Sequence, residues 1–167
     1  MTENIFRYLH RVTYAECTVG NHIYYSRYLD LLEAARGDFF RKIEMPLLKL
    51  QEQEMICPVV EAHMRYKAPA RYDDLLTIEL WLTELGPVRL NFAYRILNQE
   101  NKILLDAETW HVWTGMNGKP KRAPEILIAK IKSADEKKDK PQMNTDETIR
   151  LAADKVSRPR FGSSPQH

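Results

Sequence analysis

A short polar loop, residues 16–22, gathers several side chains that could move protons or orient a water molecule. The imidazole of His22 titrates in the range that a general base needs, and the Thr18 hydroxyl could hold a water molecule. The amide group of Asn21 could donate a hydrogen bond to a carbonyl oxygen or a water. The same residue types also bond the backbone, cap helices or simply pack. Both interpretations stay open for all three residues.

The loop leads into a long helix that is predicted to start near Ile23 and to stop at Met45-Pro46, because proline lacks an amide donor. Apolar side chains recur at a spacing of three and four residues, at Tyr24, Tyr28, Leu31, Leu32, Ala35, Phe39 and Ile43. Such a helix would run roughly 30 Å. Its first amides are unpaired and lie at the positive end of the helix dipole, so they predict a binding site for an electron-rich group.

Alternation of apolar and polar residues predicts five strands, at 5–15, 56–67, 75–84, 88–97 and 103–113. The later ones are joined by short turns, which indicates an antiparallel meander with one buried face. The long helix is the element large enough to cover that face. The fold class is therefore α+β, with short and less certain helical pieces at 47–54 and 125–131.

Composition limits the possible functions. Basic and acidic residues number 25 and 23, and a net charge of +2 gives no reason to expect nucleic-acid binding. No 18-residue apolar run or charged-then-apolar leader is visible, so neither a transmembrane segment nor export is expected. The cysteines, Cys17 and Cys57, suit reduced thiols in the cytoplasm, and no histidine–carboxylate spacing resembles a metal site. We expect one domain at 1–131 and a charged tail at 132–167, largely disordered, with a possible helical patch around 145–156.

Three motifs together resemble a known family. The first places Tyr14, Glu16, Thr18, Asn21, Ile23, Tyr28, Glu33 and Arg36 at the positions of a Tyr-x-Asp-x-Asp-x-x-Gly-x-Val-x-x-x-x-Tyr pattern followed by Glu-x-x-Arg. The second is Pro58-Val59-Val60 with Tyr66, Pro69-Ala70 and Tyr72-Asp73-Asp74, and the third runs from Gly118 to Pro124. Over residues 5–131 the chain resembles the hot-dog 4-hydroxybenzoyl-CoA thioesterase-like group, including the Tol-Pal-associated acyl-CoA thioesterases. The resemblance implies a sheet of about five strands wrapped around one long central helix.

The resemblance also implies a reaction, the hydrolysis of acyl-CoA or acyl-carrier-protein thioesters. In that family the backbone amide at the position of Tyr25 donates to the oxyanion. The catalytic aspartate of the family is replaced by Thr18, and the family glycine by Asn21. The Val19-Gly20-Asn21 triplet is similar to the loop of enediyne-type polyketide thioesterases, which also lack the acid.

Two carboxylates could stand in for the missing aspartate. Glu16 lies two residues upstream of Thr18, although its family counterpart is usually not the nucleophile. Glu33 is the alternative, because other hot-dog thioesterases carry an acid on this helix. The other interpretation of Glu33 is a solvated or interface pair with Arg36.

Coenzyme A, as part of the substrate, is the only cofactor that the resemblance implies. The basic residues Arg71, Lys119, Lys121 and Arg122 are candidates for binding its phosphates. Tyr24, Tyr28, Trp81 and Trp110 indicate either an apolar acyl pocket or plain core. Because one hot-dog unit leaves an edge strand open, we expect a homodimer or homotetramer with the site at the interface.

Two other functions stay open. A chain that lost the aspartate could have kept the pocket and become a non-hydrolytic acyl-thioester-binding or scaffold protein. A hot-dog dehydratase is a third hypothesis, although those enzymes use a histidine–acid pair on a different loop pattern.

Overall fold

The computed structural model describes residues 5–136. The strands are β1 (Phe6–Arg11), β2 (Cys17–Thr18), β3 (His22–Ile23), β4 (Val59–Tyr66), β5 (Leu75–Leu85), β6 (Arg89–Leu97) and β7 (Ile103–Val112). The helices are the 3-10 turn η1 (Tyr14–Glu16), α1 (Arg27–Lys42), α2 (Leu47–Glu52) and α3 (Glu125–Glu136). The expected tail from 137 onward, with its helical patch, lies outside the described residues.

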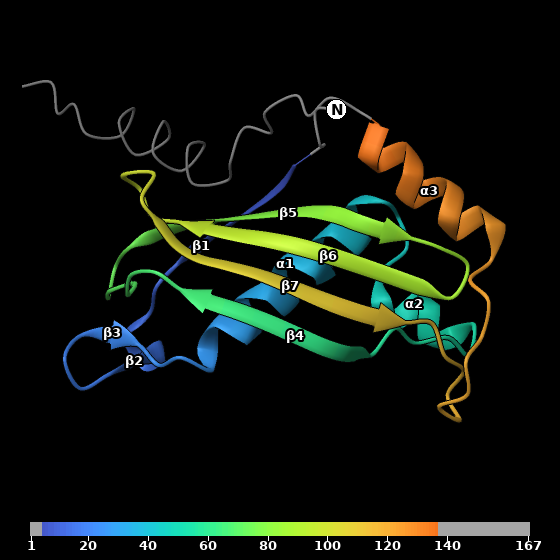
Figure 1. The fold of residues 1–167 in the computed structure, drawn as a ribbon, viewed down its shortest axis with the longest axis horizontal. Helices are drawn as coiled ribbons and strands as arrows, with labels where there is room; N and C mark the ends of the chain where they lie inside the picture. Colours follow the sequence, from blue (N-terminus) through green and yellow to red (C-terminus); the bar gives the residue numbers. More distant parts are fainter. Residues whose placement is uncertain (1–4, 137–167) are drawn as a thin grey trace, which may run out of the picture.

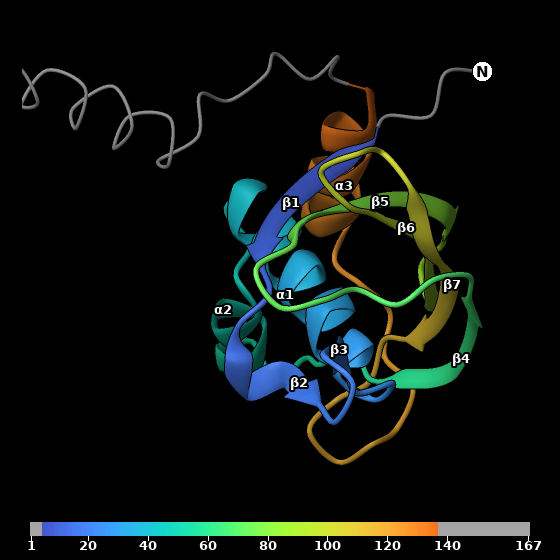
Figure 2. The same cartoon turned by 90° about the vertical axis from the view of Figure 1, so that its left-hand side faces the viewer.

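Five strands form one antiparallel sheet in the order β1-β5-β6-β7-β4, and the sheet curls around α1 (Figure 1, Figure 2). The predicted α+β class, with about five strands around one long helix, is confirmed. The meander is confirmed only for β5, β6 and β7. β4 pairs with β7 rather than with β5, because residues 67–74 carry the chain from that edge to the strand beside β1.

The core lies between α1 and the concave face of the sheet. The helix buries Tyr28, Leu31, Leu32, Ala35, Phe39 and Phe40, which are residues of the predicted apolar stripe and its neighbour Phe40. Edge-to-face rings join Phe39 and Phe40 to Phe92 on β6, and Phe40 to Trp113. Aromatic pairs at these 5.8–6.4 Å separations add to the area that they bury. The helix axis is thereby fixed across the sheet.

The helix starts later than the sequence predicts. α1 begins at Arg27, not near Ile23, and its 16 residues span about 24 Å. The reason is local pairing, since His22 and Ile23 form β3 and bond to β2 instead of entering the helix. At the other end of the chain, α3 continues to Glu136, past the domain boundary expected at 131, and buries Leu127 and Ile131.

Candidate active site

The polar loop is a small β-hairpin. β2 and β3 pair antiparallel, with Cys17 opposite Ile23 and Thr18 opposite His22. Directly paired residues point to the same side of a hairpin, so Thr18 and His22 share one face. Ile23 is buried on the other face, whereas Thr18 is exposed and His22 is half-buried. The structure therefore brings two predicted site residues together on an open face.

Two residues with positive φ make the hairpin turn, Gly20 at 93° and Asn21 at 56°. Glycine adopts this region freely, and asparagine tolerates it better than most residues. A Cβ atom at Gly20 would lie 3.3 Å from Nδ1 of His22, so glycine also leaves room for the imidazole ring. The Asn21 side-chain oxygen accepts a hydrogen bond from the Tyr72 amide at 3.3 Å. Asn21 therefore shapes the turn and anchors it.

The segment after β4 holds the hairpin and the start of α1 in place. The amide of Ile23 donates to the Ala70 carbonyl at 2.9 Å, and the amide of Ala70 donates to the Tyr28 hydroxyl at 2.9 Å. The Tyr66 hydroxyl donates to the Tyr25 carbonyl at 3.0 Å. Residues 66–70 thus fix the backbone on both sides of the predicted oxyanion donor.

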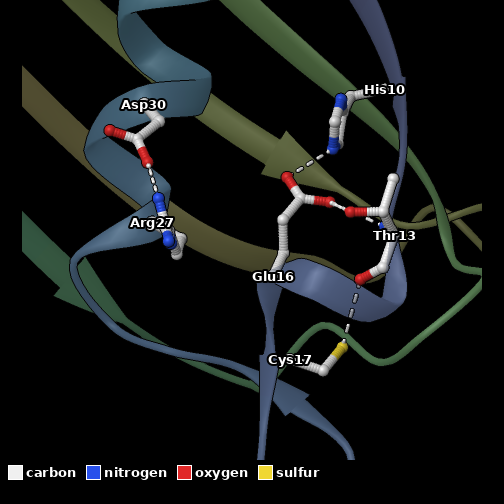
Figure 3. Close-up of polar contacts among 6 residues, drawn as sticks. All are labelled: His10, Thr13, Glu16, Cys17, Arg27 and Asp30. Atoms are coloured by element: carbon white, nitrogen blue, oxygen red, sulfur yellow. Dashed lines mark hydrogen bonds and ion pairs between the residues drawn. The ribbon is translucent and has the colours of Figure 1, made fainter.

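Glu16 is fully engaged by its neighbours (Figure 3). One carboxylate oxygen accepts from the amide and hydroxyl of Thr13, at 2.6 and 2.7 Å, and the other lies 2.8 Å from Nε2 of His10. Partial burial alone would raise the pKa of Glu16, but the Thr13 hydrogen bonds and the His10 charge outweigh it and hold the pKa below its usual value. Glu16 completes a capping box on η1. Its carboxylate is thus a weaker base than a free glutamate.

Tyr25 lies in the turn just before α1, not in the helix itself. Its side chain is 61% exposed. Nearby amides close the turn, since Arg27 donates to the Tyr24 carbonyl at 2.9 Å and Leu29 donates to the Ser26 carbonyl at 3.1 Å. Within residues 5–136, no acceptor is found for the Tyr25 amide. The amide that the family pattern predicts as the donor is therefore available. It lies just before the helix, whereas a helix start at Ile23 would have put it in the first helical turn.

Glu33 is exposed on α1, and the predicted pair with Arg36 is absent from the described contacts. Arg36 instead turns toward the sheet, where its Nη1 donates to the Tyr94 hydroxyl at 3.4 Å. The reason is position, because Arg36 is half-buried beside the core while Glu33 faces solvent. Glu33 is thus a free carboxylate rather than half of an ion pair.

A buried polar network lies under the centre of the sheet. The Thr109 hydroxyl is 3.2 Å from the Tyr94 hydroxyl and 2.8 Å from Nε2 of His111, whose Nδ1 donates to the Cys57 carbonyl at 3.3 Å. Burial, with the charge of Arg36, lowers the pKa of His111 to about 4. Burial raises the pKa of the Cys57 thiol to about 12. This network was not predicted from the sequence, because Cys57 and Tyr94 come from other parts of the chain than Thr109 and His111.

The basic segment after β7 contains two kinds of residue. Lys121 donates from Nζ to the carbonyl oxygens of Gln53 and Glu54, each at 3.1 Å, and so closes the end of α2. Lys119 and Arg122 have exposed side chains. Only these last two are placed to meet an anion from solution.

Arg71 does not join this cluster within one chain. It is exposed in the connection that enters β5, next to the anchor of the hairpin. Residues 119–122 instead follow the end of β7, which runs parallel to β5 in the same sheet. The start of β5 and the end of β7 lie at opposite ends of the sheet, and so do the two basic regions.

The aromatic residues that indicated either an acyl pocket or plain core do not gather in one place. Tyr28 is buried under the sheet, whereas Trp81 lines a cavity of about 290 Å³ on the opposite, outer face with His63, Arg65, Arg95 and Glu108 among others. Trp110 is also on that face, where its ring packs against His63 at 5.1 Å. Strand alternation explains this separation, since Trp81 and Trp110 occupy outward positions.

Neither a metal-binding cluster nor a membrane-spanning helix is found in the part of the chain that the structure describes. No group of three or more histidine, cysteine, aspartate or glutamate side chains in residues 5–136 could hold a metal ion. None of the helices between residues 5 and 136 is long and apolar enough to cross a bilayer.

The fold is that of a hot-dog protein: one helix is enclosed by a curled antiparallel sheet, and a polar hairpin precedes that helix in the chain. Residues 12–131 match the family model described as the thioesterase-like superfamily. The chain belongs to this family.

Individual relatives agree with the assignment. An acyl-CoA thioester hydrolase named YbgC from Escherichia coli is 31% identical over 133 residues, which cover 79% of this chain and 99% of the relative. Among solved structures, a probable thioesterase from Bartonella henselae superposes with a TM-score of 0.68 at 27% identity, covering 72% of this chain and 99% of that one. A hypothetical protein from Aquifex aeolicus gives a TM-score of 0.72 at 28% identity, covering 75% and 98%.

Proposed function

We propose that this chain hydrolyses acyl thioesters of coenzyme A or of an acyl carrier protein. The family and the name of the Escherichia coli relative support the reaction class. The observation that carries the proposal is the Tyr25 amide, which has no acceptor within residues 5–136 and lies three residues after His22, in the turn just before α1. Both cysteines are free thiols, which supports a cytoplasmic location.

The proposed reaction is attack by water on the thioester carbonyl carbon. Negative charge develops on the carbonyl oxygen, which accepts a hydrogen bond from the Tyr25 amide. A fixed donor of this kind is worth about 3 to 4 kcal/mol in the transition state. The carbon–sulfur bond then breaks, the thiolate takes up a proton, and the products are a carboxylic acid and a thiol.

His22 and Thr18 are the proposed pair that activates the water. A threonine hydroxyl cannot act as a base at neutral pH, but it can orient a water toward an imidazole that takes the proton. Glu16 is the weaker candidate because both of its oxygens are already hydrogen-bonded. Glu33 stays a second candidate, since it is exposed and unpaired within the described residues.

The site is proposed to lie between two copies of the chain. β4 is an open sheet edge, and Val59, Val60 and Tyr66 on it are exposed. Joining two such edges antiparallel would extend the sheet and cover these side chains. It would also bring the Arg71 end of one sheet to the Lys119–Arg122 end of the other, so that both copies could contact the phosphates of coenzyme A.

One observation favours a second candidate, a non-hydrolytic acyl-thioester-binding protein. Both carboxylate oxygens of Glu16 are already hydrogen-bonded within the loop, and the resemblance places Thr18 at the position of the family's catalytic acid. Such a chain would bind the thioester at the Tyr25 amide and release it unchanged.

Steady-state thiol release from benzoyl-, short-chain and long-chain acyl-CoAs and from an acyl carrier protein separates the two candidates. Hydrolysis well above the buffer rate, with a preference among acyl groups, supports the enzyme. Binding measured by calorimetry without turnover supports the binding protein. Hydration of crotonyl-CoA, measured in the same series, would reveal a dehydratase instead.

A further inference from the structure

The side chain of His10 connects the central sheet to the polar loop. The backbone of His10 lies on β1, opposite Leu76 of β5, so the sheet fixes its position. Nε2 of His10 is 2.8 Å from a carboxylate oxygen of Glu16, which directly precedes β2 (Figure 3). Both side chains are only partly accessible, at 21% and 19% exposure. The contact therefore joins a strand held in the sheet to the loop that carries Thr18.

The backbone of Glu16 continues this connection to the predicted oxyanion donor. The Glu16 carbonyl accepts a hydrogen bond from the Tyr24 amide at 3.2 Å. The next peptide group joins the Tyr24 carbonyl to the Tyr25 amide, and a peptide group is planar. Its carbonyl end accepts from the Arg27 amide at 2.9 Å. The direction of the Tyr25 N–H bond therefore depends on where Glu16 holds Tyr24.

The two partners of the Glu16 carboxylate act on different parts of the structure. Thr13 donates to one oxygen from its amide at 2.6 Å and from its hydroxyl at 2.7 Å. Thr13 lies three residues before Glu16, at the start of the same short turn, so these bonds shape the turn itself. His10 is six residues away and belongs to the sheet. Among the side-chain contacts of Glu16 in residues 5–136, the bond to His10 is the one that ties the turn to a sheet strand.

Other contacts hold the neighbouring backbone but not this peptide group. The Tyr66 hydroxyl donates to the Tyr25 carbonyl, which belongs to the following peptide group. The Ile23 amide donates to the Ala70 carbonyl, one residue before Tyr24. The peptide group between Tyr24 and Tyr25 thus depends on Arg27 within the turn and on Glu16 outside it.

We propose that His10 is a positioning residue: acting through Glu16, it holds the peptide group that carries the Tyr25 amide in the orientation that the developing oxyanion needs. The proposal rests on the proposed function for the reaction, although not for the contacts themselves. His10 touches neither the substrate nor the attacking water, and it exchanges no proton. A displacement of about 1 Å at a reacting centre can cost about 100-fold in rate, so a small tilt of this peptide group is enough to matter.

Three substitutions on β1 test the role by kinetics. His10→Ala removes the hydrogen bond and is expected to lower kcat about ten-fold, with KM within about two-fold. His10→Gln can place an amide donor near the position of Nε2, so its kcat is expected to stay within about three-fold of the unchanged chain. Arg7→Ala is the matched control, because Arg7 is also on β1 and bonds a carboxylate at 3.0 Å, but that carboxylate is Glu79 on β5 and not in the loop. It is expected to leave both constants unchanged.

Residual dipolar couplings of the backbone amides test the same role without a thioester, because they report the orientation of each N–H bond relative to the rest of the molecule. In His10→Ala the couplings of Tyr24 and Tyr25 are expected to change, while those of Ile78 and Leu80 in the buried part of β5 stay the same. In His10→Gln all four are expected to match the unchanged chain. A purely stabilising role would lower the free energy of unfolding without turning these N–H bonds.

The outcomes separate this proposal from the proposed reaction. An unchanged Tyr25 coupling in His10→Ala overturns the proposal, and so does an unchanged kcat in an active enzyme. Equal losses of kcat in His10→Ala and His10→Gln also overturn it, because the hydrogen bond would then not be the cause. If His10→Ala does not fold, His10→Val, which suits a strand better, replaces it with the same expected results. If the unchanged chain releases no thiol, the couplings alone decide the role of His10, and the missing turnover counts against the enzyme only.

Discussion

Thr18 and His22 are direct partners across the β2–β3 hairpin, on its solvent-accessible face. A carboxylate at position 18, as in the family pattern, could accept a proton by itself. A hydroxyl cannot, and it needs a neighbour to take the proton from the attacking water. The imidazole opposite supplies such a neighbour.

His22→Gln is expected to lower kcat for thioester hydrolysis about 100-fold and to leave KM within about two-fold, because a general base acts in the chemical step. Steady-state thiol release on the best substrate measures both constants. Val19→Ala is the matched control, since Val19 is at the tip of the same hairpin and 94% exposed. An unchanged kcat in His22→Gln would remove the histidine from the proposed chemistry.

Glu16→Gln is expected to lower the free energy of unfolding by about 1 to 2 kcal/mol at pH 7, because it weakens a charge-assisted cap. The folded-state pKa of Glu16 is below its unfolded value, so its stabilisation is present above about pH 4.3 and is lost as pH falls through the folded pKa. Urea unfolding at pH 7 and pH 3 should show the difference from the unchanged chain shrinking at the lower pH. A constant difference would mean that the charge does not matter.

His111 makes the fold sensitive to mild acid. Its folded pKa of about 4 is below the ordinary histidine value of about 6.5, so the unfolded state binds the extra proton and stability falls between those values. The unchanged chain should lose about 2 kcal/mol more than His111→Gln between pH 7 and pH 5. Urea unfolding of both proteins measures this. Equal losses would show that His111 is not held neutral.

Substitutions of Lys119 and Lys121 by alanine are expected to have different effects. Lys119→Ala removes an exposed cation and should raise KM for acyl-CoA several-fold, more so at low salt, with stability unchanged. Lys121→Ala leaves the Gln53 and Glu54 carbonyls without their donor and should cost about 1 kcal/mol of stability. Kinetics at two salt concentrations and thermal unfolding separate the effects, and identical behaviour would contradict the assignment.

Strand alternation made the central sheet predictable. Leu76, Ile78 and Leu80 on β5, and Phe92 and Tyr94 on β6, are buried as their period of two predicts. The position of β4 could not be read this way. Either β5 or β7 could have been the neighbour of β4. The path of residues 67–74 decides that β4 lies beside β7.

Three features of the candidate site were not predicted from the sequence. The helix starts later than predicted because His22 and Ile23 pair with Thr18 and Cys17 in a short hairpin. The hydrogen bonds between Thr13 and Glu16 did have a local sequence signal, since a threonine three residues before a glutamate is the capping-box spacing. In the Thr109–His111 network only these two residues are close in sequence, and the fold brings Tyr94 and Cys57 to them.

The most direct test of the proposed oxyanion donor is to remove the Tyr25 amide hydrogen. Tyr25→Pro deletes that donor, and within residues 5–136 it removes no hydrogen bond that this amide donates. Tyr25→Ala keeps the amide and is the matched control. With both variants folded by circular dichroism, the account predicts that kcat for thioester hydrolysis falls about 100- to 1,000-fold in Tyr25→Pro and within about five-fold in Tyr25→Ala. Equal kcat values in the two variants would contradict it.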